Sequence, residues 1–318
     1  MSVQGFVAAQ QRLLDRHGVD ADSRFVRLPV LCGGSAHVLV SGDGPPVLMV
    51  IGGGPPAALW VPLMAELEGF TLFAVDLPGF GLSDPMSYTT ARLRAAGAAF
   101  LQQLLDALGL AAPPVVAQSM GGLWSAFLAL EQPERVSSLS LVGCPAMIEG
   151  TSAPLLLRLT SIPWLRRMLL RLERPSPAAV DRFTSMAGED LTHLPEMREA
   201  LLEHMRLPDP GPALLEMHHA AVTPRGARPE VALTADQLSK LTHPVQLIWG
   251  ENDPFGSIEA GTRAAEHIPN AEFHIVPGGH GPWLDEPTTV ANLLTPFLHE
   301  NSTTASPTHT HPRPKAAR

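Results

Sequence analysis

The chain has 318 residues, enough to bury a full hydrophobic core, and its formal net charge is −9. That acidic balance, without a dense basic patch in the folded part, argues against nucleic acid as a partner. The two cysteines, Cys32 and Cys144, have no CxxC spacing, which argues against a disulfide framework and against a cysteine-based zinc site.

Residues 1–22 mix polar and apolar side chains, which predicts a short amphipathic helix and not a signal peptide. No apolar run approaches the roughly 20 residues that a membrane span needs. We therefore expect a soluble, cytoplasmic protein that binds a small-molecule substrate. We expect no nucleic acid, no stable membrane association, no metal and no cofactor, and the sequence leaves a homodimer open.

The first half of the chain alternates predicted strands with predicted helices. Continuous apolar runs indicate strands that are buried on both faces, and leucines at helical spacing indicate helices. Strands are predicted at 24–31, 36–40, 47–51, 70–75, 114–117 and 136–142, and helices at 59–67, at 90–110 and from 121 to about 133.

The pattern changes between residues 147 and 240, where prolines interrupt leucine-rich helical segments and no strand is convincing. Strands return at 245–249 and 272–276, with helices at 258–267 and 286–299. This alternation predicts an α/β protein with a doubly wound, mostly parallel sheet. We assign four regions: an N-terminal extension at 1–22, a core at 23–146 and 241–300, a helical cap at 147–240, and a disordered tail at 301–318.

One predicted turn carries a serine directly between a strand and a helix. Ser119 has small neighbours two positions away on each side, Ala117 and Gly121. A nucleophile elbow needs this pattern, because the strand and the helix nearly touch beside the exposed serine oxygen. A serine N-cap on a buried helix gives a similar pattern, so this stretch alone does not establish catalysis.

A serine nucleophile needs a base to accept its proton and a carboxylate to orient that base. In α/β sheets these partners follow later strands, at the carboxyl end of each. The two loops that meet this condition supply Asp253 and His280, the latter flanked by glycines. Glu251 is a nearby rival for the acid, and Glu149 is a weaker one.

An oxyanion hole needs two backbone N–H donors. The first is expected from Met120, which directly follows the serine. The second is expected from Gly53 or Gly54, because Pro55 and Pro56 have no N–H. A simple tight turn is the alternative interpretation of this Gly-Pro cluster.

Several motifs occur together and resemble those of the α/β-hydrolase superfamily, over roughly residues 26–299. They are Gln118-Ser119-Met120-Gly121-Gly122, Asp76-Leu77-Pro78-Gly79-Phe80-Gly81-Leu82-Ser83-Asp84, Gly250-Glu251-Asn252-Asp253, and Gly279-His280-Gly281-Pro282-Trp283-Leu284-Asp285-Glu286-Pro287. The resemblance implies the α/β-hydrolase fold, with Ser119, Asp253 and His280 as the catalytic triad. The serine argues against the dehalogenases and epoxide hydrolases of this superfamily, which use an aspartate there.

Two departures from the family pattern stand out. Ala117 replaces the first elbow glycine, which we expect to be harmless. Gly52 or Ile51 stands where many relatives carry a histidine before the oxyanion glycine. The side chain that often braces this loop is therefore missing.

The cap is expected to lie over the triad and to select the substrate. It is rich in leucine and methionine, which suits a fairly apolar molecule. We expect Trp164, Met168 and His218 in the cap, and Trp283 in the histidine loop, to contact the substrate. Membrane-surface contact or a partner interface is the alternative for the arginine-bearing stretch 155–174.

The leading hypothesis is a serine hydrolase that cleaves an ester, lactone or thioester of a small, fairly apolar substrate through an acyl-enzyme on Ser119. A carbon–carbon bond hydrolase of the meta-cleavage-product type is the first alternative, because relatives with Ser-Met-Gly-Gly elbows include such enzymes. A biosynthetic lyase or cyclase is another. A non-catalytic small-molecule receptor on the same fold is the alternative from a different functional class.

Overall fold

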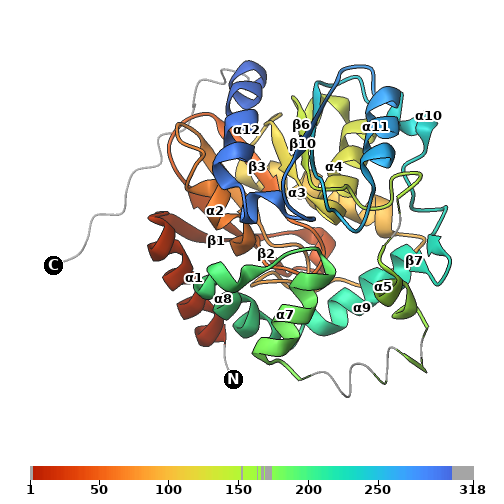
Figure 1. The fold of residues 1–318 in the computed structure, drawn as a ribbon. Helices are drawn as coiled ribbons and strands as arrows, with labels where there is room; N and C mark the ends of the chain where they lie inside the picture. The colour runs from red at the N-terminus through yellow and green to blue at the C-terminus, as the bar shows by residue number, and fades with distance from the viewer. Residues whose placement is uncertain (1–2, 152, 163, 166–167, 169–173, 303–318) are drawn as a thin grey trace.

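An eight-stranded sheet forms the centre of the protein, with helices on both faces and further helices over one edge (Figure 1). The computed structural model describes residues 3–151, 153–162, 164–165, 168 and 174–302. The strand order is β1-β2-β4-β3-β5-β6-β9-β10, and every pairing after the antiparallel β1–β2 and β2–β4 pairs is parallel. The predicted doubly wound, mostly parallel sheet is thereby confirmed. Its strands are β1 (Ala21–Arg27), β2 (Ser35–Ser41), β3 (Pro46–Val50), β4 (Thr71–Val75), β5 (Val115–Ala117), β6 (Leu139–Val142), β9 (Val245–Gly250) and β10 (Ala271–Val276).

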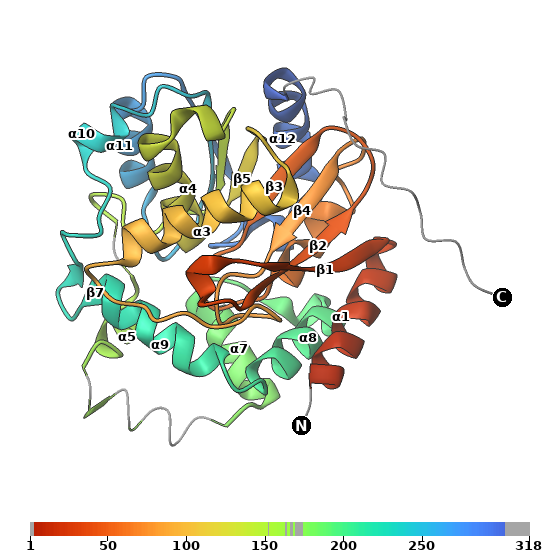
Figure 2. The ribbon, with the colours of Figure 1, turned by 180° about the vertical axis from the view of Figure 1, so that it is seen from behind.

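Helices cover both faces of the sheet and bury its central strands. The helices α3 (Leu93–Leu108) and α4 (Ser119–Glu131) pack side by side on one face (Figure 2). On the other face, α2 (Val61–Met64) contacts α12 (Pro287–Asn301). The residues of β5, β6 and β9 are all buried, as their largely apolar sequences predict, and the two polar residues Ser140 and Gln246 are buried with them. The helix α11 (Ile258–His267) has the predicted bounds.

Four described helices of residues 147–240 lie together over the carboxyl ends of the strands (Figure 1). They are α5 (Leu155–Leu159), α7 (Pro177–Met186), α8 (Pro195–Met205) and α9 (Pro210–Ala221), whereas α10 (Ala235–Leu238) packs against α11 of the core. Three of them begin at a proline, where the missing N–H costs no hydrogen bond. The prolines that interrupt the sequence pattern therefore start helices as well as separate them.

The N-terminal helix α1 (Val3–His17) packs against cap helix α8. Arg12 reaches across to Glu199 at 2.8 Å, and the ring of Phe6 lies 5.7 Å from that of His204. The predicted amphipathic helix is present, and it supports the cap from outside.

Some element boundaries differ from the prediction. The chain forms a 3-10 turn at Pro29–Leu31 in place of the end of the predicted strand, since Pro29 has no N–H to pair. The predicted strand at 136–142 begins only at Leu139. A two-residue hairpin, β7 (Val222–Thr223) with β8 (Gly226–Ala227), lies in the cap, where no strand was expected. Most of the predicted tail, 303–318, falls outside the described residues.

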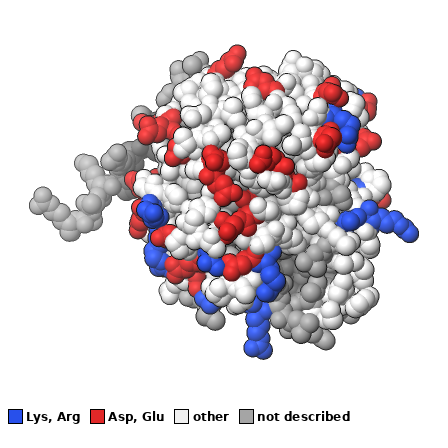
Figure 3. All heavy atoms as spheres, in the orientation of Figure 1, with Lys and Arg blue, Asp and Glu red and all other residues white. Residues whose placement is uncertain are grey.

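Charge is spread unevenly over the surface. In Figure 3 acidic side chains form a band down the centre of the face shown, and basic side chains stand mainly toward the cap. No helix in the described part of the chain combines the length and apolarity that a membrane crossing requires.

The elbow's tight contact yields a test of the fold. A Cβ at Gly121 would clash with the carbonyl oxygens of Val50 and Ile51, whereas one at Gly122 would lie 3.3 Å from Pro145. We expect Gly121→Ala to lower the free energy of unfolding by about 1–3 kcal/mol, the usual cost of overpacking. Gly122→Ala is the matched control and should change it by less than about 1 kcal/mol, because alanine is the better helix former. Equal urea midpoints for the two variants would contradict the elbow contact.

Candidate active site

Ser119 lies at a strained turn between β5 and α4. Its φ is +50°, a left-handed value that is uncommon for a residue with a side chain. The turn is held from both sides, because Gln118 N–H donates to Val50 O at 3.0 Å and Ala146 N–H donates to Ser119 O at 2.9 Å. The strain is thus maintained by the surrounding structure, as in a nucleophile elbow.

His280 and Asp253 meet below the same turn. Nδ1 of His280 donates to the Asp253 carboxylate, 2.9 Å from Oδ2 and 3.1 Å from Oδ1. That carboxylate is buried and also accepts the N–H groups of Cys144 at 2.8 Å and Phe255 at 2.9 Å. The two backbone N–H groups hold the carboxylate in place. The carboxylate in turn keeps the imidazole proton on Nδ1, which leaves Nε2 as the acceptor.

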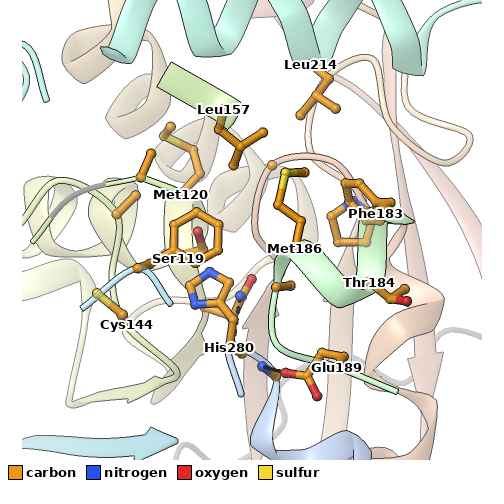
Figure 4. Close-up of a pocket in the computed structure, with 18 of the residues that line it drawn as sticks. Ser119, Met120, Cys144, Leu157, Phe183, Thr184, Met186, Glu189, Leu214 and His280 are labelled. Carbon is orange, nitrogen blue, oxygen red and sulfur yellow. Dashed lines mark hydrogen bonds between the residues drawn. The ribbon is translucent and has the colours of Figure 1, made fainter. Parts of the chain in front are cut away.

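The other imidazole nitrogen faces the serine side of the site. Nε2 of His280 is buried and has no hydrogen-bond partner among the residues that the structure describes. Ser119 and His280 line one cavity and lie next to each other in Figure 4. Asp253 and His280 are therefore hydrogen-bonded and Ser119 lines the same cavity as His280, while no hydrogen bond joins Ser119 to Nε2.

The rival acids lie elsewhere. Glu149 is exposed and accepts the N–H of Ala235 at 3.0 Å. Glu251 is also exposed, and its carboxylate contacts the side chain of Asn252 at 3.4 Å. Neither carboxylate has a contact with His280, so the geometry favours Asp253.

Phe255 stacks on the imidazole of His280, with ring centroids 4.0 Å apart and planes inclined by 25°. It comes from the same loop as Asp253 and lines the cavity. Sequence reasoning missed this residue. The only available signal was its place two positions after the acid, because stacking depends on how two separate loops meet.

Two of the three predicted oxyanion donors lie at this cavity. Met120 and Gly53 both line it, and a Cβ at Gly53 would lie 3.8 Å from the Cβ of Met120. Gly54 has φ +123° and faces Phe183. Gly53 is therefore the better candidate for the second donor.

The loop beside the serine has no room for a larger residue at Gly52. A Cβ there would lie 2.8 Å from the Cβ of Ser119 and would also clash with the Gln118 side chain. The glycine found in place of a bracing histidine is thus required by close contact with the elbow.

The cavity over the triad has a volume of about 110 Å³. A second cavity of about 400 Å³ lies within the cap. We call it the cap cavity, and we call the cavity over the triad the inner cavity. The cap side chains on the far wall come from α5, α7 and α9 and face Ser119 in Figure 4. Both cavities are mostly apolar, and they share Leu157, Phe183, Met186, Leu201, Leu214 and His218.

Of the four residues expected to contact the substrate, only His218 lines the cavities. The side chains of Trp164 and Met168 are 68% and 43% exposed and line neither cavity, so the prediction for these two is corrected. Trp283 is also corrected. It is fully buried, stacks on Trp60 at 4.1 Å, and donates its indole N–H to Leu59 O at 2.9 Å.

Few polar groups line the inner cavity. Burial lowers the pKa of His218 to about 4, so this imidazole is uncharged near neutral pH. Burial raises the pKa of Glu189 to about 7. No Lys or Arg of the described chain lines the inner cavity, and Arg182 stands at the second one. Within the described residues, no group of three or more His, Cys, Asp or Glu side chains could hold a metal ion.

A second Ser–His–Asp row lies in the sheet. Ser23 Oγ is 2.8 Å from His37 Nε2, and His37 Nδ1 is 2.7 Å from Asp76 Oδ2. Asp76 also accepts the N–H groups of Ala57 and Leu82, which closes the loop after β4. Ser23 sits in a regular antiparallel strand and lines neither cavity. This row braces the sheet and its loop.

Comparison with known proteins agrees with this geometry. The sequence profile of a family described as alpha/beta hydrolase fold matches residues 45–287. A 2-hydroxy-6-oxononadienedioate/2-hydroxy-6-oxononatrienedioate hydrolase from Paraburkholderia phymatum is 30% identical, over 84% of this chain and 91% of the relative. A pimeloyl-[acyl-carrier protein] methyl ester esterase from Nitrosomonas europaea is 28% identical, over 80% of this chain and 95% of the relative.

Among solved structures, the carboxylesterase CesB from Bacillus subtilis superposes with a TM-score of 0.72 at 22% identity. The superposition covers 93% of this chain and 98% of that one. Family profile, relatives and fold agree. The chain belongs to the α/β-hydrolase fold family and is a hydrolase.

Proposed function

We propose that this hydrolase cleaves carboxylic esters of fairly apolar acids through an acyl-enzyme on Ser119. The observation that carries the proposal is the unpartnered Nε2 of His280 beside Ser119, at the floor of an apolar cavity. Nucleophilic acyl transfer requires that the serine proton can pass to an imidazole nitrogen, so we propose that the Ser119 hydroxyl turns toward Nε2, with which it forms no hydrogen bond in this structure.

The reaction follows from these positions. Nε2 of His280 takes the Ser119 proton as Oγ attacks the ester carbonyl, and the Asp253 carboxylate stabilises the resulting imidazolium. The backbone N–H groups of Met120 and Gly53 stabilise the oxyanion. His280 then gives its proton to the leaving alcohol. In the second half, His280 deprotonates a water molecule that attacks the acyl-enzyme and releases the acid.

A carbon–carbon bond hydrolase is the second candidate, because several relatives carry such names. The substrate in those names is a dicarboxylate. The described lining of the inner cavity offers no Lys or Arg, burial keeps the imidazole of His218 uncharged near neutral pH, and Arg182 lines only the cap cavity. Burying an unpaired carboxylate there would cost several kcal/mol. This favours the ester over the dienedioate as the substrate class.

The triad is tested by substitution. We expect Ser119→Ala and His280→Ala each to lower kcat on a p-nitrophenyl ester by about 10⁴ or more, with little further loss in the double variant. Asp253→Asn should also impair turnover, because it disturbs the imidazole tautomer.

Glu251→Gln and Glu149→Gln are the controls and should retain near-wild-type rates. Mass spectrometry after treatment with a fluorophosphonate should locate an adduct on Ser119 of the wild type. A folded wild type that forms no adduct would favour a non-catalytic receptor. Full activity of Ser119→Ala would favour a lyase.

Substrate preference is tested with acyl chains of increasing length. Each buried CH₂ contributes up to about 0.8 kcal/mol, so kcat/KM should rise up to about four-fold per carbon along a short series. The measurement compares p-nitrophenyl esters from acetate upward with a vinylogous diketone. A preference for acetate, or turnover of the diketone alone, would contradict the apolar-ester proposal.

The passage between the two cavities gives a sharper test. Leu214 lines both cavities. We expect Leu214→Trp to fill this passage and to shift the preferred acyl chain to a shorter length. The acetate ester is the internal control, and its kcat/KM should stay within about two-fold because a short chain needs only the inner cavity. An unchanged length profile would show that the chain does not enter the cap cavity.

A further inference from the structure

The backbone on both sides of the His280 side chain is held by three hydrogen bonds. The His280 N–H donates to Ala187 O at 2.9 Å, and the His280 carbonyl accepts from the Gln118 side chain at 3.2 Å. The Gly281 N–H donates to Oε1 of Glu189 at 2.6 Å. Two of the three partners belong to the cap, so the cap directly holds the backbone of the histidine.

The cap and the histidine loop are in close contact at their backbones and at the Glu189 side chain. A Cβ at Gly279 would lie 2.6 Å from Gly188 O and 2.7 Å from Oε1 of Glu189. Gly188 itself has φ +80°, which favours glycine. Residues 187–189 therefore lie directly on the loop that carries His280, and this contact leaves little freedom for either segment.

The Glu189 carboxyl group occupies an unfavourable position. Its residue is 5% exposed, and Oε2 has no hydrogen-bond partner within the described part of the chain. Its pKa is raised to about 7, mainly by burial; the Gly281 N–H and His280 oppose this rise, and the nearby carboxylates of Asp285 and Asp253 add to it. A buried, half-satisfied carboxyl group beside a catalytic base is typical of a functional residue.

Further charged groups complete the surroundings of Glu189. Asp190, in the same cap loop, is exposed and accepts the N–H of Thr192 at 2.9 Å. His193, in the turn that follows, lies 3.7 Å from Asp285. Both stand on the solvent side, and neither has a hydrogen bond to Glu189.

We propose that the ionised form of Glu189 is a positioning residue, which holds His280 in line with Ser119 and favours the imidazolium during proton transfer. This proposal rests on the proposed serine mechanism. A hydrogen bond from Gly281 N–H to a carboxylate is stronger than one to a neutral acid, and a negative charge near the ring favours its protonated state in the transition state. The Glu189 side chain then links the position of the cap to the orientation of the His280 imidazole.

The rate of Ser119 modification by a fluorophosphonate tests this without knowledge of the substrate. We compare the second-order rate constants of the wild type and Glu189→Gln between about pH 5.5 and 8.5. The ratio of wild type to variant should rise from about one at the acid end to about ten at the alkaline end, the loss expected for a charge-assisted hydrogen bond. The change should be centred near pH 7, because Glu189 is protonated below that pH and matches glutamine.

Asp190→Asn removes a neighbouring charge in the same loop and is the matched control. Its ratio to the wild type should stay near one at every pH.

Thermal unfolding supplies the second readout. The pKa of Glu189 is raised from 4.5 to about 7 by folding, so its contribution to stability is complete below about pH 4.5 and is lost as the pH rises to about 7. Glutamine has no such loss. The Tm of Glu189→Gln minus the Tm of the wild type should therefore be larger at pH 8 than at pH 5. At pH 8 the variant should nevertheless react more slowly with the fluorophosphonate. A purely structural hydrogen bond would make the variant both slower and less stable.

Two results would overturn the inference. One is a rate ratio for Glu189→Gln that does not change with pH. The other is a wild-type rate that falls above pH 7 while that of Glu189→Gln does not, since the protonated acid would then be the active form. Failure of the folded wild type to label at Ser119 would instead overturn the proposed function, and this inference with it.

Discussion

The left-handed backbone at Ser119 is the constraint on which the site depends. A residue with a side chain holds φ near +50° only if its neighbours prevent relaxation. Here the helix must approach the carbonyl oxygens of Val50 and Ile51, which requires Gly121, and the adjoining loop must approach the serine itself, which requires Gly52. Fully buried strands on both sides supply the rigidity. These strands hold the backbone of Ser119 in place, and the residue lines the cavity.

The two Ser–His–Asp rows show that hydrogen-bond geometry alone does not make a nucleophile. The distances in the row that contains Ser23 are as short as those around His280. That serine lies in an extended strand with a regular partner, and its histidine already has a partner on both nitrogens. At the cavity, Nε2 of His280 has no partner among the described residues, and Met120 and Gly53 line the same space as Ser119. The proposed mechanism uses this unpaired nitrogen, which the row with Ser23 does not offer.

Much of the fold and the triad could be predicted from the sequence because their determinants are local. Continuous apolar runs marked the buried strands, and small residues around Ser119 marked the elbow. The acid and the base followed from their place after β9 and β10. The comparisons establish the family and the fold, while the roles of the triad residues stay a proposal.

The substrate-contacting residues were predicted less well, because their orientation depends on tertiary packing. Trp164 turns outward and Trp283 joins a buried pair with Trp60, although their places in the cap and in the histidine loop predicted contact with the substrate. Phe255 and Glu189 were missed for the same reason. Each makes a contact with His280 or its loop that joins segments far apart in the chain.

The contact between residues 187–189 and the histidine loop also limits how such enzymes can diversify. The cap looks like an exchangeable module, since an insertion can change while the sheet and triad stay the same. In this chain, two of the three hydrogen bonds on the His280 and Gly281 backbone come from the cap, and the one from Glu189 depends on its side chain. A cap taken from a relative would keep that bond only if it also brought an acceptor to the Gly281 N–H. The short segment that touches the histidine loop is therefore tied to the core as well as to the cap.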